Sequence, residues 1–142
     1  MFACAPHTIS SGAVTDQFRT YRPWFWAAVL YNVTWGAAVV VNPRWFLWSA
    51  NVGEASAPLA QSIGMMVAVY AYGYYLLARD PARFAPLIWI ALAGKTFGAI
   101  GFMTCALAGA LPWRFGLNTV MNDVIWLPTF WTFALRYARH DA

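Results

Sequence analysis

Two ionisable residues stand in surroundings that are otherwise almost entirely apolar. Lys95 lies within the apolar stretch 86–107, and Asp123 lies within the stretch 115–137. A lysine at the centre of a bilayer costs on the order of 3 kcal/mol on insertion scales, so it requires a partner or water. Antiparallel helices over the two stretches bring the side chains to similar depths. We therefore expect Lys95 and Asp123 to be in contact, either directly or through water.

Amides and an indole extend this polar centre. Asn118, Asn122 and Trp126 recur at steps of four residues, which places them in one stripe of a helix with Asp123 beside it. A further amide stands near the middle of an earlier apolar stretch. The predicted polar centre has these members: Asn32, Lys95, Asn118, Asn122, Asp123 and Trp126.

Two interpretations of this centre remain open. In the structural one, buried amides and an ion pair determine which helices adjoin, as a polar core residue sets the register of a coiled coil. In the functional one, the centre binds a headgroup, a quinone-like ring or a proton in transit, since ionisable residues inside a membrane are functional candidates. A proton relay normally needs a chain of acidic or histidine side chains, and the sequence shows none.

Recognisable catalytic and metal-binding patterns are missing. The sequence has no G-x-S-x-G motif, no neighbouring Cys–His pair and no phosphate-binding glycine loop. Cys105 is interpreted as a small core residue, and His, Cys and carboxylates are too few for a metal set. We therefore expect no catalytic residue, no metal and no cofactor, and we favour a protein that is not an enzyme.

The composition is that of a membrane protein. Of the 142 residues, 61% are hydrophobic and only 10% are charged. Nine of the hydrophobic residues are Trp. Soluble domains have about a quarter charged residues, and tryptophan collects at membrane boundaries. The net charge of +4 is carried by isolated arginines near the ends of apolar runs, without the basic stripe that nucleic-acid binding requires. The expected partner is the lipid bilayer, and nucleic acid is not expected.

The apolar stretches predict an all-α membrane four-helix bundle of up-down-up-down topology. The expected spans cover residues 24–41, 58–78, 86–107 and 115–137, within a bundle of residues 23–137. Each is long enough to cross a bilayer about 30 Å thick at 1.5 Å per residue. Residues 1–22 form an N-terminal arm and residues 138–142 a tail. Residues 44–57 are expected to be a loop whose aromatic residues belong to a membrane-interface belt.

The arginines predict the orientation. Four spans place both termini and the turn 79–83 on one side, which carries Arg19, Arg22, Arg79, Arg83, Arg136 and Arg139. The other side carries only Arg44 and Arg114. Because lysine and arginine accumulate on the cytoplasmic side, we expect cytoplasmic termini and a multi-pass protein of the bacterial inner membrane.

Small residues predict close helix packing. Gly64 and nearby alanines form a seam on the second span, and Gly94, Gly98 and Gly101 share a side of the third. Such seams let neighbouring helices approach closely. We expect the second and third spans to pack through them.

Several short motifs together resemble a known layout: Gly73-Tyr74-Tyr75, Asp80-Pro81-Ala82-Arg83, Gly94-Lys95 with Gly98, and Asn122-Asp123 with Trp126 and Pro128. They resemble a group of small, uncharacterised bacterial four-span membrane proteins, which is similar in layout to the DoxX-like proteins. The resemblance covers about residues 24–137 and implies a four-helix inner-membrane protein. It implies no activity and no catalytic residue.

Two functional hypotheses follow. The first is a non-enzymatic membrane protein that binds a lipid-like molecule, or serves as an accessory subunit associated with other membrane proteins or with itself. The second is a small transporter or membrane enzyme that acts on a hydrophobic substrate at a Lys95–Asp123 centre.

Overall fold

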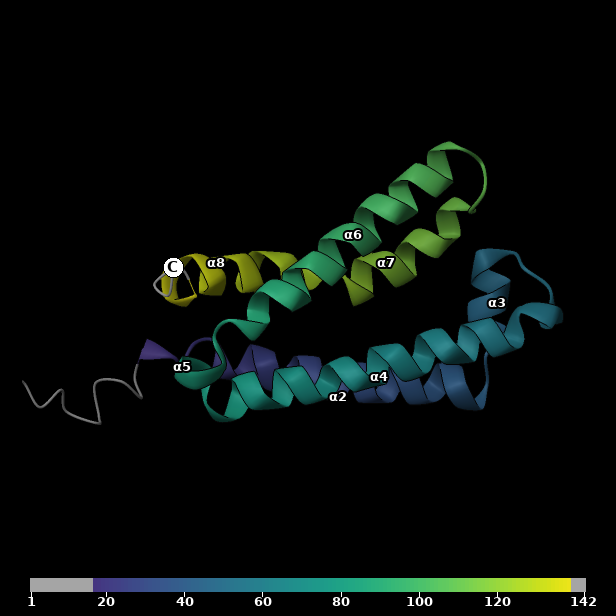
Figure 1. The fold of residues 1–142 in the computed structure, drawn as a ribbon. Helices are drawn as coiled ribbons and strands as arrows, with labels where there is room; N and C mark the ends of the chain where they lie inside the picture. Colours follow the sequence, from purple (N-terminus) through teal and green to yellow (C-terminus); the bar gives the residue numbers. More distant parts are fainter. Residues whose placement is uncertain (1–16, 139–142) are drawn as a thin grey trace, which may run out of the picture.

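The part of the chain that the structure describes consists of helices joined by short connections. The structure, a computed structural model, describes residues 17–138, and this range contains no strand (Figure 1). The predicted all-α class is therefore confirmed. The predicted arm up to residue 16 and the tail from residue 139 lie outside the described residues. The first three apolar stretches form single helices whose ends lie within two residues of the predicted ones: α2 (Arg22–Val41), α4 (Ala57–Arg79) and α6 (Leu87–Leu107).

Prolines mark the ends of these helices. Pro23 and Pro58 stand at the first turns of α2 and α4, where the missing N–H costs no helical hydrogen bond. Helix α2 ends at Val41, and its C-cap Asn42 leaves the helical region with a φ of −140° and a ψ of 88°, because Pro43 disfavours the helical conformation in the residue before it. The sequence therefore set these boundaries locally.

The fourth apolar stretch is not the single helix that was predicted. It consists of α7 (Gly116–Asn122), a 3-10 turn η3 (Val124–Trp126) and α8 (Leu127–Tyr137). The interruption lies at Asp123, whose φ and ψ of −121° and −61° leave the α-helical region. The polar centre thus coincides with a broken helix.

The helices are arranged as two hairpins that meet at one end. Helices α2 and α4 lie side by side, and α6 lies beside α8 and α7 (Figure 1). All of the long helical segments contribute to one core near the described chain ends, which includes Phe25, Tyr74, Ile88, Phe130 and Phe133. The two ends of the described range meet here, because the ring of Phe18 lies 4.8 Å from that of Tyr137 between centroids.

At the opposite end α6 diverges from α4, and smaller elements occupy the space (Figure 1). The predicted loop 44–57 contains helix α3 (Arg44–Ala50), which ends at Asn51 with a left-handed φ of 60°, and a 3-10 turn η1 (Glu54–Ser56). A second 3-10 turn, η2 (Trp113–Phe115), precedes α7. A small second core joins α2, α3 and α4 through Val39, Phe46, Leu47 and Ala60.

The turn 79–83 also contains a helix, α5 (Pro81–Phe84). The side chain of Asp80 accepts a hydrogen bond of 3.1 Å from the N–H of Arg83, so an aspartate caps this short helix. The guanidinium of Arg22 donates to the carbonyls of Ala78 and Arg79, which satisfies the C-terminal end of α4.

The small-residue seam joins a different pair of helices from the predicted one. A Cβ added at Gly36 would lie 2.5 Å from the carbonyl oxygen of Gly64, and one added at Gly64 would lie 2.9 Å from that of Gly36. Gly64 thus packs α4 against α2, the first and second stretches. Gly94 and Gly98 instead face side chains, and a Cβ at Gly101 would meet no atom within 4 Å.

Two helices of the described chain are long and apolar enough to cross a membrane. They are α2 and α6, each with a mean hydropathy of 1.5. Helix α4 contains Gln61, Ser62 and four tyrosines, which lower its hydropathy. The fourth stretch is divided by its break. The four-span topology and the sidedness of the termini remain predictions.

Candidate functional site

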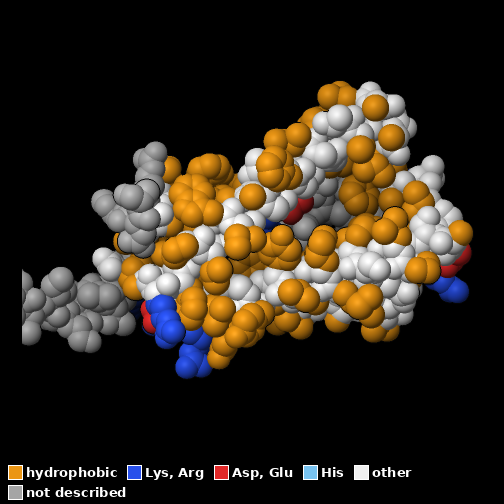
Figure 2. All heavy atoms as spheres, in the orientation of Figure 1, with side chains coloured by type: hydrophobic (Ala, Val, Ile, Leu, Met, Phe, Trp, Pro, Cys, Tyr) orange, Lys and Arg blue, Asp and Glu red, His pale blue; other side chains and the backbone are white. Residues whose placement is uncertain are grey.

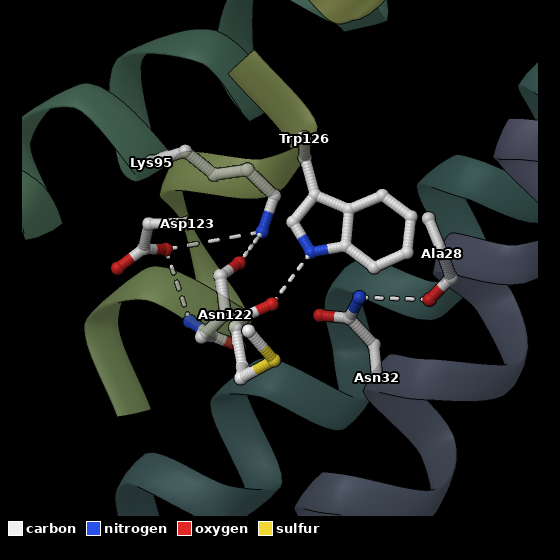
Figure 3. Close-up of polar contacts among 7 residues, drawn as sticks. Ala28, Asn32, Lys95, Asn122, Asp123 and Trp126 are labelled. Carbon is white, nitrogen blue, oxygen red and sulfur yellow. Dashed lines mark hydrogen bonds and ion pairs between the residues drawn. The ribbon is translucent and has the colours of Figure 1, made fainter. Parts of the chain in front are cut away.

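The interruption at Asp123 exposes backbone carbonyls that side chains then satisfy. In a continuous helix the carbonyl of Asn122 would accept the N–H of Trp126, but that N–H bonds to the Asp123 carbonyl at 3.2 Å. The Asn122 carbonyl accepts a hydrogen bond from Lys95 Nζ. The carbonyl of Met121 accepts one from Trp126 Nε1 at 2.9 Å. The lysine and the indole therefore cap a helix end inside the protein (Figure 3).

The predicted contact between Lys95 and Asp123 is present. Lys95 Nζ lies 3.8 Å from Asp123 Oδ1, and only 5% of the lysine surface is exposed. The ammonium also lies 5.8 Å from the ring centroid of Tyr74 and 6.0 Å from that of Trp126. Aromatic faces attract a cation at such distances. The buried ammonium of Lys95 is thus surrounded by a backbone carbonyl, a carboxylate and two aromatic rings.

The Asp123 carboxylate is held from two sides. Its Oδ1 accepts a hydrogen bond of 3.0 Å from Asn122 Nδ2. Its Oδ2 lies against α6 at Gly98, where an added Cβ would be 2.7 Å away. Gly98 therefore provides room for the carboxylate, whereas the sequence predicted that it would pack helix against helix.

Asn32 faces the same centre from α2 without a direct bond to the ion pair. It is 2% exposed, and its Nδ2 donates to the carbonyl of Ala28 at 2.7 Å. Its Oδ1 points toward Asn122 and Trp126 (Figure 3) and accepts no hydrogen bond among the described residues. The amide therefore presents an acceptor to the space around Lys95 and Asp123.

Asn118 and Trp126 do not extend one stripe as predicted, because the break rotates the residues after Asp123. Asn118 Nδ2 donates to Ser49 Oγ at 2.8 Å and so ties α7 to α3. Trp126, in η3, is 4% exposed and turns its indole back to Met121. Of the predicted members, Asn118 is the one that bonds to α3.

Two adjoining cavities open between the hairpins. The polar cavity, of about 200 Å³, is lined by Lys95, Asp123, Asn122 and Asn32 together with apolar side chains and two tyrosines. The apolar cavity, of about 300 Å³, extends toward α3 and is lined largely by aromatic and aliphatic side chains such as Phe97, Phe102 and Phe115. They share Ile63, Val67, Gly98, Asn122 and Asp123. Figure 2 shows a hollow between α4 and α6 with acidic side-chain atoms at its floor.

Tyr70 and Tyr74 are site residues that the sequence-based prediction missed. Both line the polar cavity, and a Cβ at Gly94 would lie 3.2 Å from the hydroxyl oxygen of Tyr70. Their spacing of four residues placed them on one face of α4. Tyrosines are so common in membrane-interface belts, however, that this spacing did not distinguish a cavity wall from packing.

The site contains both hydrogen-bond donors and acceptors and has no net charge. Lys95 donates, Asp123 and Asn32 accept, and the tyrosine hydroxyls do either. Within residues 17–138, no cluster of three or more His, Cys, Asp or Glu side chains is close enough to hold a metal ion. The arrangement is suited to binding a polar group at one end of an apolar cleft.

Comparison with known proteins yields no match to a protein-family model, to a curated protein or to a solved structure. The resemblance to four-span DoxX-like proteins therefore stays a prediction.

Proposed function

We propose that this chain is a non-enzymatic, four-span protein of the bacterial inner membrane that binds a lipid-like molecule between its two hairpins. The observation that carries the proposal is the buried Lys95–Asp123 pair at the floor of a largely apolar cleft. An ionisable pair at this depth is a functional candidate, and a concave apolar site with few polar groups is the usual form of a small-molecule site.

The apolar outer surface supports membrane insertion of all four stretches. Large hydrophobic side chains are exposed on every long helix, including those that fall short in hydropathy. Examples are Leu30 at 67% on α2, Val69 at 71% on α4, Phe97 at 71% on α6 and Leu135 at 44% on α8. A monomer in water rarely exposes contiguous apolar patches of more than a few hundred Å², whereas lipid covers such a surface at no cost.

The charged residues support the same arrangement. At the end with the described termini lie Arg19, Arg22, Arg79, Asp80, Arg83 and Arg136, and at the other lie Arg44, Glu54 and Arg114. Among the described residues, only Lys95 and Asp123 are charged between these ends. The 20 residues of α2 span about 30 Å at 1.5 Å each, which matches the hydrocarbon thickness. The more basic end is the cytoplasmic one under the positive-inside rule.

Cysteine labelling tests this topology. In a variant with Cys4 and Cys105 replaced by serine, Gly53→Cys and Ala82→Cys place single thiols in connections at opposite ends. A membrane-impermeant maleimide should label position 53 in intact spheroplasts and position 82 only after lysis. Equal labelling of both, or recovery of the chain in the soluble fraction, contradicts the four-span proposal.

Lipid retention tests the binding function. Protein extracted in mild detergent should carry a bound amphiphile that is released on denaturation and identified by mass spectrometry. The Ile63→Trp variant, which fills the boundary of the two cavities, should carry much less. Leu30→Trp on the outer face of α2 is the matched control and should retain the wild-type amount. Equal lipid in all three proteins contradicts a specific site.

A transporter is the second candidate, and the break at Asp123 favours it. Transporters place discontinuous helices at substrate sites near the bilayer midplane, where the freed backbone groups contact the cargo. Vesicles containing the purified protein should then move a fluorescent amphiphile between leaflets faster than protein-free vesicles, and Ile63→Trp should abolish the difference. Association with other subunits or with itself is tested by native mass measurement after the same extraction.

A further inference from the structure

We infer that the ligand of the cleft is an uncharged amphiphile with a hydroxylated head, of the monoacylglycerol type, and that Asn32 helps to select it. This inference rests on the proposed binding function and specifies its ligand. The head occupies the polar cavity beside Lys95, Asp123 and Asn32, and the chain lies in the apolar cavity.

Charge balance selects an uncharged head. Lys95 and Asp123 compensate each other, and no other charged side chain lines either cavity. A phosphate or a fatty-acid carboxylate would add an unpaired negative charge to a largely apolar cleft beside an existing carboxylate. Such a charge is costly when it has no partner, so these heads are disfavoured.

Hydrogen bonding selects a head that both donates and accepts. Asn32 is 98% removed from solvent, its Nδ2 is bound to Ala28, and its Oδ1 remains without a donor. Asn122 Oδ1 belongs to the same cavity lining, is buried and has no hydrogen-bond partner among the described residues, and such an acceptor carries the full cost of desolvation. The Asn32 oxygen lines this cavity as well and is open to a donor from a ligand. A hydroxyl can donate to this oxygen while a second oxygen of the same head accepts from Lys95. A quinone carbonyl would accept from Lys95 and leave Asn32 unsatisfied.

The shape of the cleft selects an elongated tail. The polar cavity has space for a compact head, and it continues at Ile63, Val67 and Gly98 into the apolar cavity of about 300 Å³. Gly98 and Gly101 leave space beside α6 along this path, because neither carries a side chain. A single acyl chain therefore extends from the ion pair toward Phe115 without turning back.

The experiment compares three probes with the same chain and different heads. Delipidated, full-length protein in detergent is titrated with 1-monooleoylglycerol, oleic acid and 1-oleoyl-lysophosphatidic acid, and binding is measured by native mass spectrometry. Monooleoylglycerol should bind at least about tenfold more tightly than either anion. Asn32→Leu keeps the side-chain size but removes the acceptor. This variant should weaken the binding of monooleoylglycerol about fivefold, which is equivalent to the loss of one net hydrogen bond.

The controls separate this inference from the function on which it rests. Thr34→Val, on the exposed face of α2, should leave all three affinities unchanged. Should Asn32→Leu fail to fold, Asn32→Ser tests the same position with a shorter polar side chain. Equal or tighter binding of an anion, or no effect of a folded Asn32 variant on monooleoylglycerol, overturns the inference and leaves the binding function standing. Absence of binding for every probe, together with no retained lipid, overturns both.

Discussion

The two hairpins use the same residue types for different purposes. In the α2–α4 hairpin, Gly36 and Gly64 bring two uninterrupted helices into backbone contact. In the other hairpin, Gly98 leaves space for a carboxylate, and the facing helix is broken at Asp123. Glycine in these helices thus marks either a tight packing contact or room for a polar group, and the neighbouring element decides which.

The hairpins also differ in how they satisfy the backbone. Along α2 and α4 the backbone stays helical without a break, and the side chains of Arg22 and Gln61 donate to carbonyls only near the helix ends. The exposed hydroxyls of Thr34 and Ser62 bond within their own helices. In the second hairpin, side chains of Lys95 and Trp126 take over two carbonyls at the break. The first hairpin therefore consists of continuous helices, and the second supplies the ion pair at a helix break.

Loss of the lysine should have the largest effect on stability. Lys95→Met leaves the Asn122 carbonyl without its donor and the Asp123 carboxylate without its opposite charge, and breaking a buried pair costs about 3–5 kcal/mol. Denaturant unfolding in detergent measures this loss. The double variant Lys95→Met with Asp123→Leu should be less destabilised than the sum of the single variants. Full additivity contradicts an energetic coupling between the two side chains.

Adding one methyl group to the seam between Gly36 and Gly64 should cause the second-largest loss of stability. Gly36→Ala places a Cβ 2.5 Å from the carbonyl oxygen of Gly64, so the two backbones must separate. We expect a loss of about 2 kcal/mol, within the range for overpacking. Gly101→Ala is the matched control, because no atom lies within 4 Å and alanine has the higher helix propensity. Thermal unfolding should move in opposite directions for the two variants.

The indole cap should contribute a smaller amount. Trp126→Phe retains a large aromatic ring but removes the donor to the Met121 carbonyl at 2.9 Å. We expect a loss of about 1–2 kcal/mol, because a buried acceptor is left unsatisfied. Trp131→Phe, at an indole that is 42% exposed on α8, should change the unfolding free energy by less than about 0.5 kcal/mol. Equal effects would show that the cap has no energetic role.

The smallest change in stability is expected for Gly98→Ala, although its Cβ would come within 2.7 Å of an oxygen. Here the neighbour is the end of the Asp123 side chain, which can rotate, whereas the neighbour of Gly36 is backbone. We expect a change below about 1 kcal/mol together with weaker amphiphile binding, measured by lipid retention. A loss as large as that of Gly36→Ala would mean that the carboxylate is held rigidly.

The contact between Lys95 and Asp123 was predictable because a lone charge among apolar residues has few ways to be satisfied. The role of Asn118 was not predictable, because the sequence-based prediction assumed a continuous helix through Asp123, and the helix is broken there. Its amide bonds instead to Ser49 in α3, which is distant in the sequence. The seam partner of Gly64 was also assigned to the wrong helix, because a small-residue pattern indicates close packing but does not name the neighbour.

The sequence by itself determined the helical class, the ends of the first three long helices, and the need to neutralise Lys95. These features follow from apolar length, from prolines near helix ends and from the cost of an isolated buried charge. Only the tertiary structure decided that α4 packs on α2, that the last long stretch breaks at Asp123, and that an open cleft remains beside the ion pair. Those outcomes depend on contacts between distant segments, where several helix pairings bury similar small residues and shape alone distinguishes them.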